Sequence, residues 1–237
     1  MARLPRLTVP GLPHYVLQRG NNLQPIFVDD QDRVRMKELL REMSRRFGVE
    51  VHAYVLLPNQ LHLLLTPERA DSLPLMMQSV GRSYVRSFNN RHGRSGTLWE
   101  GRYRATVLEP QTWLLPAMVA LEYLPVQMGL VTLPQEFAWG SAPHNAGLHP
   151  DVLLRAHGMY WSLGDTPFAR EAAYLRLLRD GVSPRAAEAV HDAAYKGWAL
   201  GEGDFVARLQ QHTPRRISRR SPGRPKAGAA GAGSAPA

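Results

Sequence analysis

The sequence predicts an α+β fold: a ferredoxin-like antiparallel sheet with helices on one face, then a small helical extension and a basic tail. Two observations support this prediction. The first half of the chain alternates between strand-like and helix-like patterns in the order β-α-β-β-α-β, which is the ferredoxin-like order. After about Gly140 the strand patterns end and helical segments with proline at their starts follow.

The first strand and the first helix are predicted at residues 12–20 and 29–47. The strand reads LPHYVLQRG and ends in a Gly-Asn-Asn turn. The helix has apolar residues at helical spacing, and Gly48 after it is a typical C-cap. We expect its buried face to consist of Val34, Leu39, Leu40, Met43 and Phe47.

The next two strands form a predicted hairpin, residues 49–57 and 60–66, joined by a Pro-Asn turn. The first strand alternates, which places Val49, Val51, Ala53, Val55 and Leu57 on one face. In the second strand the same alternation places Gln60 and His62 on one face and Leu61, Leu63 and Leu65 on the other. A His-x-His pair at this place would suggest a metal site, and here its first half is missing.

A second helix is predicted at residues 72–91, with Arg82 and Arg86 on its polar side. A Gly-rich basic loop follows and leads into a strand at about 103–109. A third helix is expected at 113–123, and its proline, Pro116, has to lie in the first turn or kink the helix.

Three divisions of the chain are predicted: residues 1–140, a helical extension at 141–212 and a disordered tail at 213–237. Thr166-Pro167 and Ser183-Pro184 open the extension's helices, predicted at 168–180 and 185–196, and a further short helix is expected at 204–211. These helices are compatible with a helix–turn–helix reader and equally with helices that cover the first domain.

The charge of the chain favours a polyanionic partner. The formal net charge is +9 and the isoelectric point is about 10.3. Six of the basic residues lie in the tail, which has no acid, and without them 23 basic residues face 20 acidic ones. There is no cysteine, no apolar run long enough to span a membrane and no secretory signal, so a cytoplasmic location is expected.

Four separated strings carry a resemblance to a known family. They are PHYVLQRG, RFGVEVHAYVLLPNQLHLLL, GRSGTLWEGRYRA and PVQMGLV, in this order and at these distances. They resemble the REP-associated tyrosine transposases, a branch of the single-tyrosine HUH transposases that act on single-stranded DNA. The resemblance covers residues 1–139, and the segment GWALGEGDFVARL resembles the extension of longer members.

The resemblance implies a metal-dependent phosphotyrosine chemistry. In that family two histidines bind Mg²⁺ or Mn²⁺, and a tyrosine one helical turn before a third ligand attacks the phosphate. Here His62 remains, and Gln60 stands where the first histidine is expected. In the register set by PVQMGLV, the nucleophile position is Ala120 and the third-ligand position is Leu124, while Tyr123 is a weak substitute nucleophile.

The resemblance therefore implies a protein that binds hairpin or single-stranded DNA, such as repetitive palindromes, with weak or absent metal binding and with cleavage lost. Mixed aromatic and cationic side chains suit unpaired bases and phosphates. The candidate DNA-binding residues are Arg82, Arg86, Trp99, Arg102, Tyr103, Arg104, Arg215, Arg216, Arg219, Arg220, Arg224 and Lys226. Residues 221–226 (SPGRPK) also resemble the core of an AT-hook.

Other interpretations remain open at this point. The chain could be an active transposase that uses His62, Gln60 and another tyrosine, or an RNA-binding module, since RRM domains share the ferredoxin-like topology. His62 alone could be a hydrogen-bonded core histidine, and Trp99 could belong to the core. Arg82 and Arg86 could form a solvated helix face. The sequence does not decide the oligomeric state.

Overall fold

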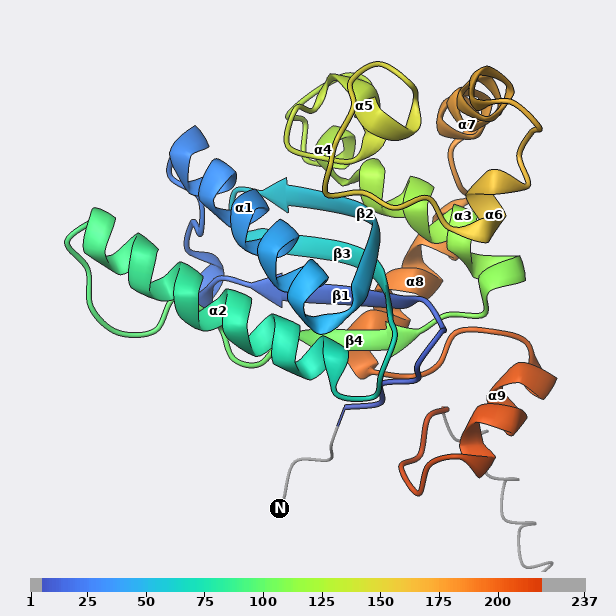
Figure 1. Ribbon diagram of the computed structural model, residues 1–237, viewed down its shortest axis with the longest axis horizontal. Helices are drawn as coiled ribbons and strands as arrows, with labels where there is room; N and C mark the ends of the chain where they lie inside the picture. The colour runs from blue at the N-terminus through green and yellow to red at the C-terminus, as the bar shows by residue number, and fades with distance from the viewer. Residues whose placement is uncertain (1–5, 219–237) are drawn as a thin grey trace, which may run out of the picture.

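A four-stranded antiparallel sheet forms the centre of the computed structural model, which describes residues 6–218 (Figure 1). The strand order is β2-β3-β1-β4, so the ferredoxin-like fold is confirmed. The strands are β1 (His14–Arg19), β2 (Val49–Leu57), β3 (Gln60–Pro67) and β4 (Arg104–Val107). Helices α1 (Asp30–Phe47) and α2 (Ser72–Arg91) connect them, close to the predicted bounds.

The remaining helices follow the sheet. They are α3 (Pro110–Glu122), α4 (Leu124–Gln127), α5 (Ala142–Asn145), α6 (Gly158–Trp161), α7 (Pro167–Asp180), α8 (Pro184–Lys196) and α9 (Gly203–Gln211), with 3₁₀ turns at Asn21–Leu23 and Pro134–Glu136. The predicted start of α3 is wrong. Pro110 at the first helical position starts it three residues early, so Pro116 lies inside the helix. The ring of Pro116 costs one backbone hydrogen bond there.

Helix α1 begins and ends at the predicted caps. The Asp29 side chain accepts a hydrogen bond from the backbone N–H of Asp32, and Gly48 adopts the left-handed conformation with φ of 63°. One predicted core residue is wrong: Val34 is 46% exposed, whereas Met36 is fully buried. At 100° per residue, Val34 lies about 160° around the helix from Met36.

A β-bulge in β2 overturns the prediction that five alternating residues share one face. The register shifts between Val51 and Ala53, with His52 as the extra residue. Val49 and Val51 therefore pack beneath α1 and α2, while Ala53 and the two later residues of the predicted set pack on the opposite face. The His52 ring is held by the Arg155 carbonyl at 2.7 Å and the Thr66 hydroxyl at 2.8 Å.

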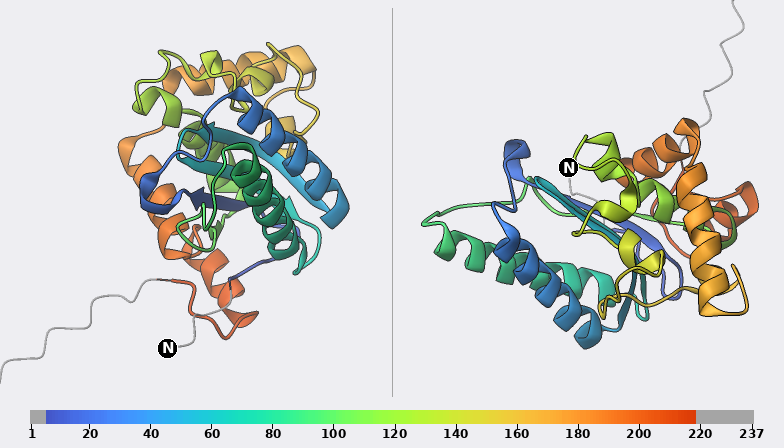
Figure 2. Two further views of the ribbon diagram at one scale, coloured as in Figure 1. Left: turned by 90° about the vertical axis from the view of Figure 1, so that its left-hand side faces the viewer. Right: turned by 90° about the horizontal axis from the view of Figure 1, so that it is seen from above.

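The two faces of the sheet are covered by different parts of the chain (Figure 2). Helices α1 and α2 cover one face. On the other face, α3, α7 and α8 share one apolar cluster with the sheet, in which Tyr15 and Leu64 pack with Tyr174 and Val190. The helical extension therefore covers the first domain and is continuous with its core.

The extension also occupies both edges of the sheet. Along β2, the backbone N–H of Ser141 donates to the Tyr54 carbonyl at 2.9 Å, and the N–H of Arg155 donates to the Val51 carbonyl at 2.8 Å. Along β4, the N–H of Leu200 donates to Val107 at 2.9 Å. Strand edges without partners invite pairing with other chains, so this covering protects both sides.

The start of the predicted tail is ordered, contrary to the expectation that nothing beyond Thr213 is buried. Ile217 is fully buried against Phe205 and Leu209 of α9. Its carbonyl accepts a hydrogen bond from the N–H of Ala199 at 2.8 Å. The tail cations from Arg219 onward and the SPGRPK segment lie outside the described residues. Within residues 6–218, no helix is long and apolar enough to cross a membrane.

A buried carboxylate ties the start of α1 to the end of α2. Asp32 is 3% exposed and accepts from the N–H of Val28 at 2.8 Å, from Arg91 at 2.6 Å and from His92 at 3.0 Å. We expect Asp32→Ala to lower the free energy of unfolding by about 1–3 kcal/mol, because the N–H of Val28 and the His92 ring lose their acceptor and Arg91 keeps Asp29 but loses the buried part of its ion pair.

The matched control for this variant is Asp30→Ala. The Asp30 side chain is 75% exposed in its pair with Arg33. Its loss should cost less than about 0.5 kcal/mol. Urea unfolding of both variants measures the difference, and equal losses would contradict the assigned role of Asp32.

A second buried carboxylate joins α3 to the extension. Glu122 accepts hydrogen bonds from the Ser141 hydroxyl at 2.5 Å, the Asn145 amide at 2.8 Å and the Tyr174 hydroxyl at 2.7 Å. Burial outweighs these donors and raises the pKa of Glu122 to about 7. The folded protein therefore keeps a proton that the unfolded chain releases above pH 4.5.

This proton makes folding less favourable as the pH rises from about 4.5 to about 7. We expect Glu122→Gln to remove that contribution. The difference in the free energy of unfolding between variant and parent should shift in the variant's favour by up to about 1.4 kcal/mol per pH unit within this window. Urea unfolding at several pH values measures it, and a constant difference would show that Glu122 is ionised in the folded protein.

Candidate functional site

His62 lies on β3 with its side chain on the face that α3 and α8 cover. It is fully buried, and its Nδ1 lies 2.8 Å from the Tyr15 hydroxyl. Its Nε2 is buried, with no hydrogen-bond partner among the described residues. Burial, with a smaller effect of His191, lowers the pKa of His62 to about 3, so the imidazole is neutral. Gln60, half-buried at the start of β3, pairs across the sheet with Arg19 and Leu57.

A hollow of about 300 Å³ lies beside this histidine, between β1, α3 and α8. Ala120 and Leu124 line it from the α3 side, as their spacing of four requires, and Tyr15 lines it from the sheet. Val190 and His191 of α8 line its far side. Tyr15 is 2% exposed and burial raises the pKa of its hydroxyl, so it is a poor nucleophile.

Tyr123 is turned away from this hollow. Its hydroxyl donates to the backbone carbonyl of Leu178 in α7 at 2.5 Å. The hydroxyl thus helps to hold the extension against α3 and is engaged in a structural contact.

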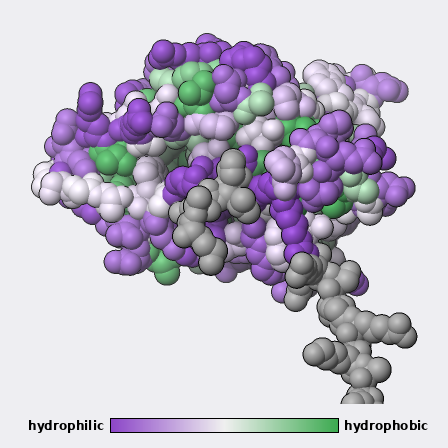
Figure 3. Space-filling view, turned by 90° about the horizontal axis from the view of Figure 1, so that it is seen from below, coloured by the Kyte–Doolittle hydropathy of each residue, from purple (hydrophilic) through white to green (hydrophobic). Residues whose placement is uncertain are grey.

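A different hollow brings together five of the eight candidate DNA-binding side chains that the structure describes. It is a groove of about 730 Å³ between α2 and the loop before β4. Arg82 and Arg86 line it from α2, where both are exposed, and Trp99 and Arg102 line it from the loop. The face that carries α2, β4 and α9 is largely hydrophilic (Figure 3).

Trp99 belongs to the core and to the groove at once. Its ring packs 5.8 Å from the Tyr84 ring, and its Nε1 donates to the Gly81 carbonyl at 3.4 Å. A Cβ on Gly81 would lie 3.5 Å from the same nitrogen, which is an ordinary contact, so the indole rests directly on this part of α2. This packing holds the loop against the arginine face of the helix.

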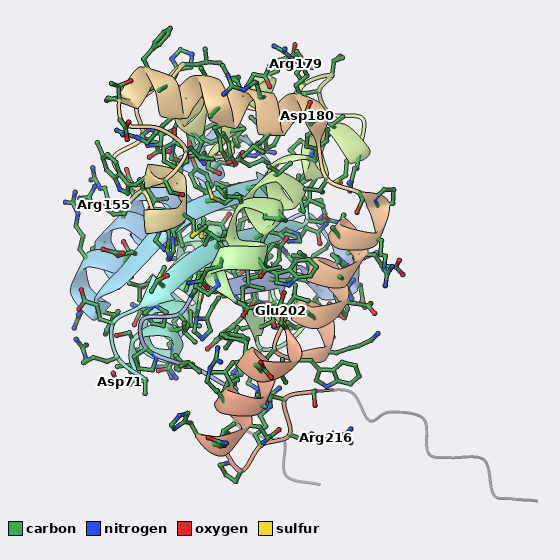
Figure 4. The ribbon with its side chains drawn as sticks, turned by 90° about the vertical axis from the view of Figure 1, so that its right-hand side faces the viewer. Asp71, Arg155, Arg179, Asp180, Glu202 and Arg216 are labelled. Carbon is green, nitrogen blue, oxygen red and sulfur yellow. The ribbon has the colours of Figure 1, made fainter. Side chains whose placement is uncertain are left out.

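Two other candidates are less available than the sequence suggests. Tyr103 is 8% exposed, and the Arg6 guanidinium lies 3.9 Å above its ring. Arg104 turns toward the extension: it donates to the Tyr195 carbonyl at 3.0 Å and lies 4.4 Å from the Tyr195 ring. Arg215 lies near by and donates to the Gly197 carbonyl, while Arg216 is exposed beyond α9 (Figure 4).

Several groups that line this groove or the two smaller hollows next to it were not predicted from the sequence. They are Arg6, Gln18, Arg19, Tyr195 and Lys196. Arg19 ends β1 and forms a two-point ion pair with Glu100 of the loop. Alternation in the first strand could have indicated Arg19. No local signal marks Tyr195 or Lys196, because only the packing of α8 brings them to the sheet.

Residues 14–114 match the family described as Transposase IS200 like. They form an IS200-like transposase domain. The match begins with β1 and ends within α3, so it includes the hairpin with His62, the helix α2 and the loop with Trp99. The positions of Ala120, Tyr123 and Leu124 lie beyond it.

Solved structures of transposases resemble the chain. One is a REP-associated tyrosine transposase bound to a REP hairpin, with 18% identity and a TM-score of 0.51, covering 63% of this chain and 89% of that one. Another is a putative transposase from Deinococcus radiodurans R1, with 22% identity and a TM-score of 0.36, covering 47% of this chain and 89% of that one. No curated protein matches the chain.

The metal chemistry implied by the resemblance does not suit the donors that the transposase domain presents. Among residues 6–218, no three histidine, aspartate or glutamate side chains are placed to share a metal ion. His62 is the one imidazole of the expected pair, the amide of Gln60 is a weaker donor, and Leu124 offers no donor. Because His62 is fully buried, a metal ion held by it would have no position open to a phosphate.

Proposed function

We propose that this protein is a DNA-binding member of the REP-associated tyrosine transposase type, that it binds hairpin or single-stranded DNA, and that it has lost cleavage. The groove between α2 and the Trp99 loop carries this proposal. It combines exposed guanidinium groups for phosphates with the half-buried indole of Trp99 for unpaired bases. One relative of similar fold is bound to a REP hairpin, which supports a foldback as the ligand.

The loss of cleavage follows from what lies at the catalytic positions. A phosphotyrosine reaction needs a reachable hydroxyl and a metal to offset charge on the phosphate oxygens. The hollow lined by Tyr15, the hydrogen-bond partner of His62, has Ala120 and Leu124 at the two helix positions, so these positions offer it neither a tyrosine hydroxyl nor a metal ligand. We expect weak or absent binding of Mg²⁺ or Mn²⁺ for the same reason.

The architecture disfavours the RNA-binding alternative. An RRM stacks bases on the open face of its four-stranded sheet. Here α1 and α2 cover one face, and α3 and α8 cover the other. With DNA as the partner, we place the protein in the cytoplasm.

The groove arginines should carry the electrostatic part of binding. We expect the double variant Arg82→Ala/Arg86→Ala to weaken binding to hairpin and single-stranded DNA of any sequence. The slope of log affinity against log salt should become shallower by about 1.4–1.8, since each lost phosphate contact removes about 0.7–0.9. Fluorescence anisotropy at several salt concentrations measures both effects.

Arg179→Ala is the matched control for this pair. Arg179 is exposed at the end of α7, far from Asp71, which precedes α2 (Figure 4). It removes one of the two positive charges that the double variant removes and should leave the slope nearly unchanged. A slope change half as large as that of the double variant would show that net charge, rather than this groove, attracts the DNA.

The protein should form no covalent adduct with DNA. The test incubates it with labelled single strands that contain a hairpin, with Mg²⁺ or Mn²⁺, and resolves the products on a denaturing gel. We expect neither cleavage nor adduct, because Ala120 cannot attack phosphorus and Leu124 cannot bind a metal. A metal-dependent adduct would overturn this expectation, and its loss in Tyr123→Phe would identify the nucleophile.

The triple change Gln60→His, Ala120→Tyr and Leu124→Asn is the positive counterpart. It restores the groups that the resemblance implies at all three positions. Recovery of even slow cleavage would confirm the assignment of these positions and with it the loss of activity in the parent.

A further inference from the structure

We propose that the helical extension supplies a second part of the DNA-binding surface. In this arrangement Tyr195 and Lys196, at the end of α8, bind a single-stranded DNA segment that continues from the groove between α2 and the Trp99 loop. The inference rests on the proposed function, and it assigns to the extension a role in recognition besides its role in covering the sheet.

Two hollows meet at Arg102. The groove of about 730 Å³ lies on one side of it, and a hollow of about 320 Å³ lies on the other, between β4 and the end of α8. Both are lined by Arg6, Arg102 and Tyr103, and the second is also lined by Tyr195 and Lys196. A strand that leaves the groove across Arg102 therefore enters the hollow beside α8.

The side chains of the second hollow suit a nucleic-acid strand. The half-buried ring of Tyr195 has the Arg104 guanidinium 4.4 Å from its centre and the Arg19 guanidinium 5.4 Å from it. The part of the ring that lines the hollow offers a surface for a base, and the two guanidinium groups offer charges for the flanking phosphates. Among the described residues that line the hollows around Arg102, Glu100 alone has a carboxylate, and Arg19 neutralises it.

Tyr195 is held in place before any DNA binds. Its backbone carbonyl accepts from Arg104 at 3.0 Å, and the Gly197 carbonyl accepts from Arg215 at 2.7 Å. Gly197 ends α8 in the left-handed conformation with φ of 69°, and the next carbonyl, of Trp198, accepts from the Thr106 hydroxyl on β4. A platform that is already ordered loses little conformational entropy when it binds.

The ligand for this hollow is a single strand. A hollow of about 320 Å³ is small beside a duplex, and stacking on a tyrosine requires a base that is not already stacked in one. In a foldback, such bases lie in the unpaired segment at the foot of the stem. We therefore assign the groove at α2 to the hairpin and the hollow at α8 to the strand that extends from it.

The experiment compares a hairpin with the same hairpin carrying an unpaired extension of about six nucleotides. The unaltered protein should bind the extended DNA more tightly. Tyr195→Ala should weaken binding of the extended DNA by about 5- to 150-fold, which corresponds to the loss of one stacked base, and should change binding of the bare hairpin less than about twofold. Tyr195→Phe keeps the ring and should bind as the parent does.

A second measurement uses the unaltered protein, so it does not depend on the folding of a variant. The unpaired segment of the DNA carries 5-iodouracil at single positions. Irradiation cross-links this DNA to the protein, and mass spectrometry identifies the attached residue. We expect attachment at Tyr195. Attachment confined to residues of the groove between α2 and the Trp99 loop would overturn the inference.

The outcomes separate this inference from the proposed function. If the unaltered protein binds neither DNA, the proposed function fails. If it binds both equally and Tyr195→Ala changes nothing, the inference fails and the proposed function stands. If Tyr195→Ala loses the same affinity for the bare hairpin and for the extended hairpin, Tyr195 does not stack on the unpaired DNA segment, and the inference is overturned.

Discussion

The packing of α8 against β1, β4 and α3 is the contact on which the rest of this structure depends. Val190 and Ala194 are buried in the cluster that contains Tyr15 and Leu64 of the sheet. This contact covers the second face of a sheet that would otherwise expose a row of apolar side chains. It also forms one wall of the hollow lined by Tyr15, Ala120 and Leu124, and it brings Tyr195 to the basic loop. The stability of the sheet and the shape of both hollows thus depend on this one contact.

Complete burial makes His62 part of the core of the sheet. A neutral imidazole with one hydrogen bond, to Tyr15, behaves as a core residue, although its second nitrogen has no partner among the described residues. An unsatisfied buried nitrogen of this kind costs about 1–3 kcal/mol. The surrounding apolar cluster has to offset that cost. A residue chosen for packing alone would have no such nitrogen, which is consistent with the descent implied by the resemblance.

Sequence patterns predicted the features that local rules decide. The ends of α1 follow from Asp29 and Gly48, and the shared face of Gln60 and His62 follows from alternation in a regular strand. The alternation rule failed in β2 because of the bulge at His52. The His52 ring is held there by the carbonyl of Arg155, about 100 residues away in the sequence, which no local pattern indicates. Ile217 was missed for a similar reason: its buried surroundings are assembled from α9, β4 and the start of the chain. The groove residues were found from composition and resemblance, whereas Tyr195 needed the tertiary structure.

The residues at positions 120 and 124 suit the helix that packs across them. Ala120 is 7% exposed and Leu124 is half-buried, and both face a hollow whose far wall is α8. Larger side chains at these positions would extend into this hollow of about 300 Å³, toward Glu188 and His191 of α8. A helix packs closely only where the facing side chains leave room for it, so the small and apolar side chains of α3 and α4 and the position of α8 are matched to each other.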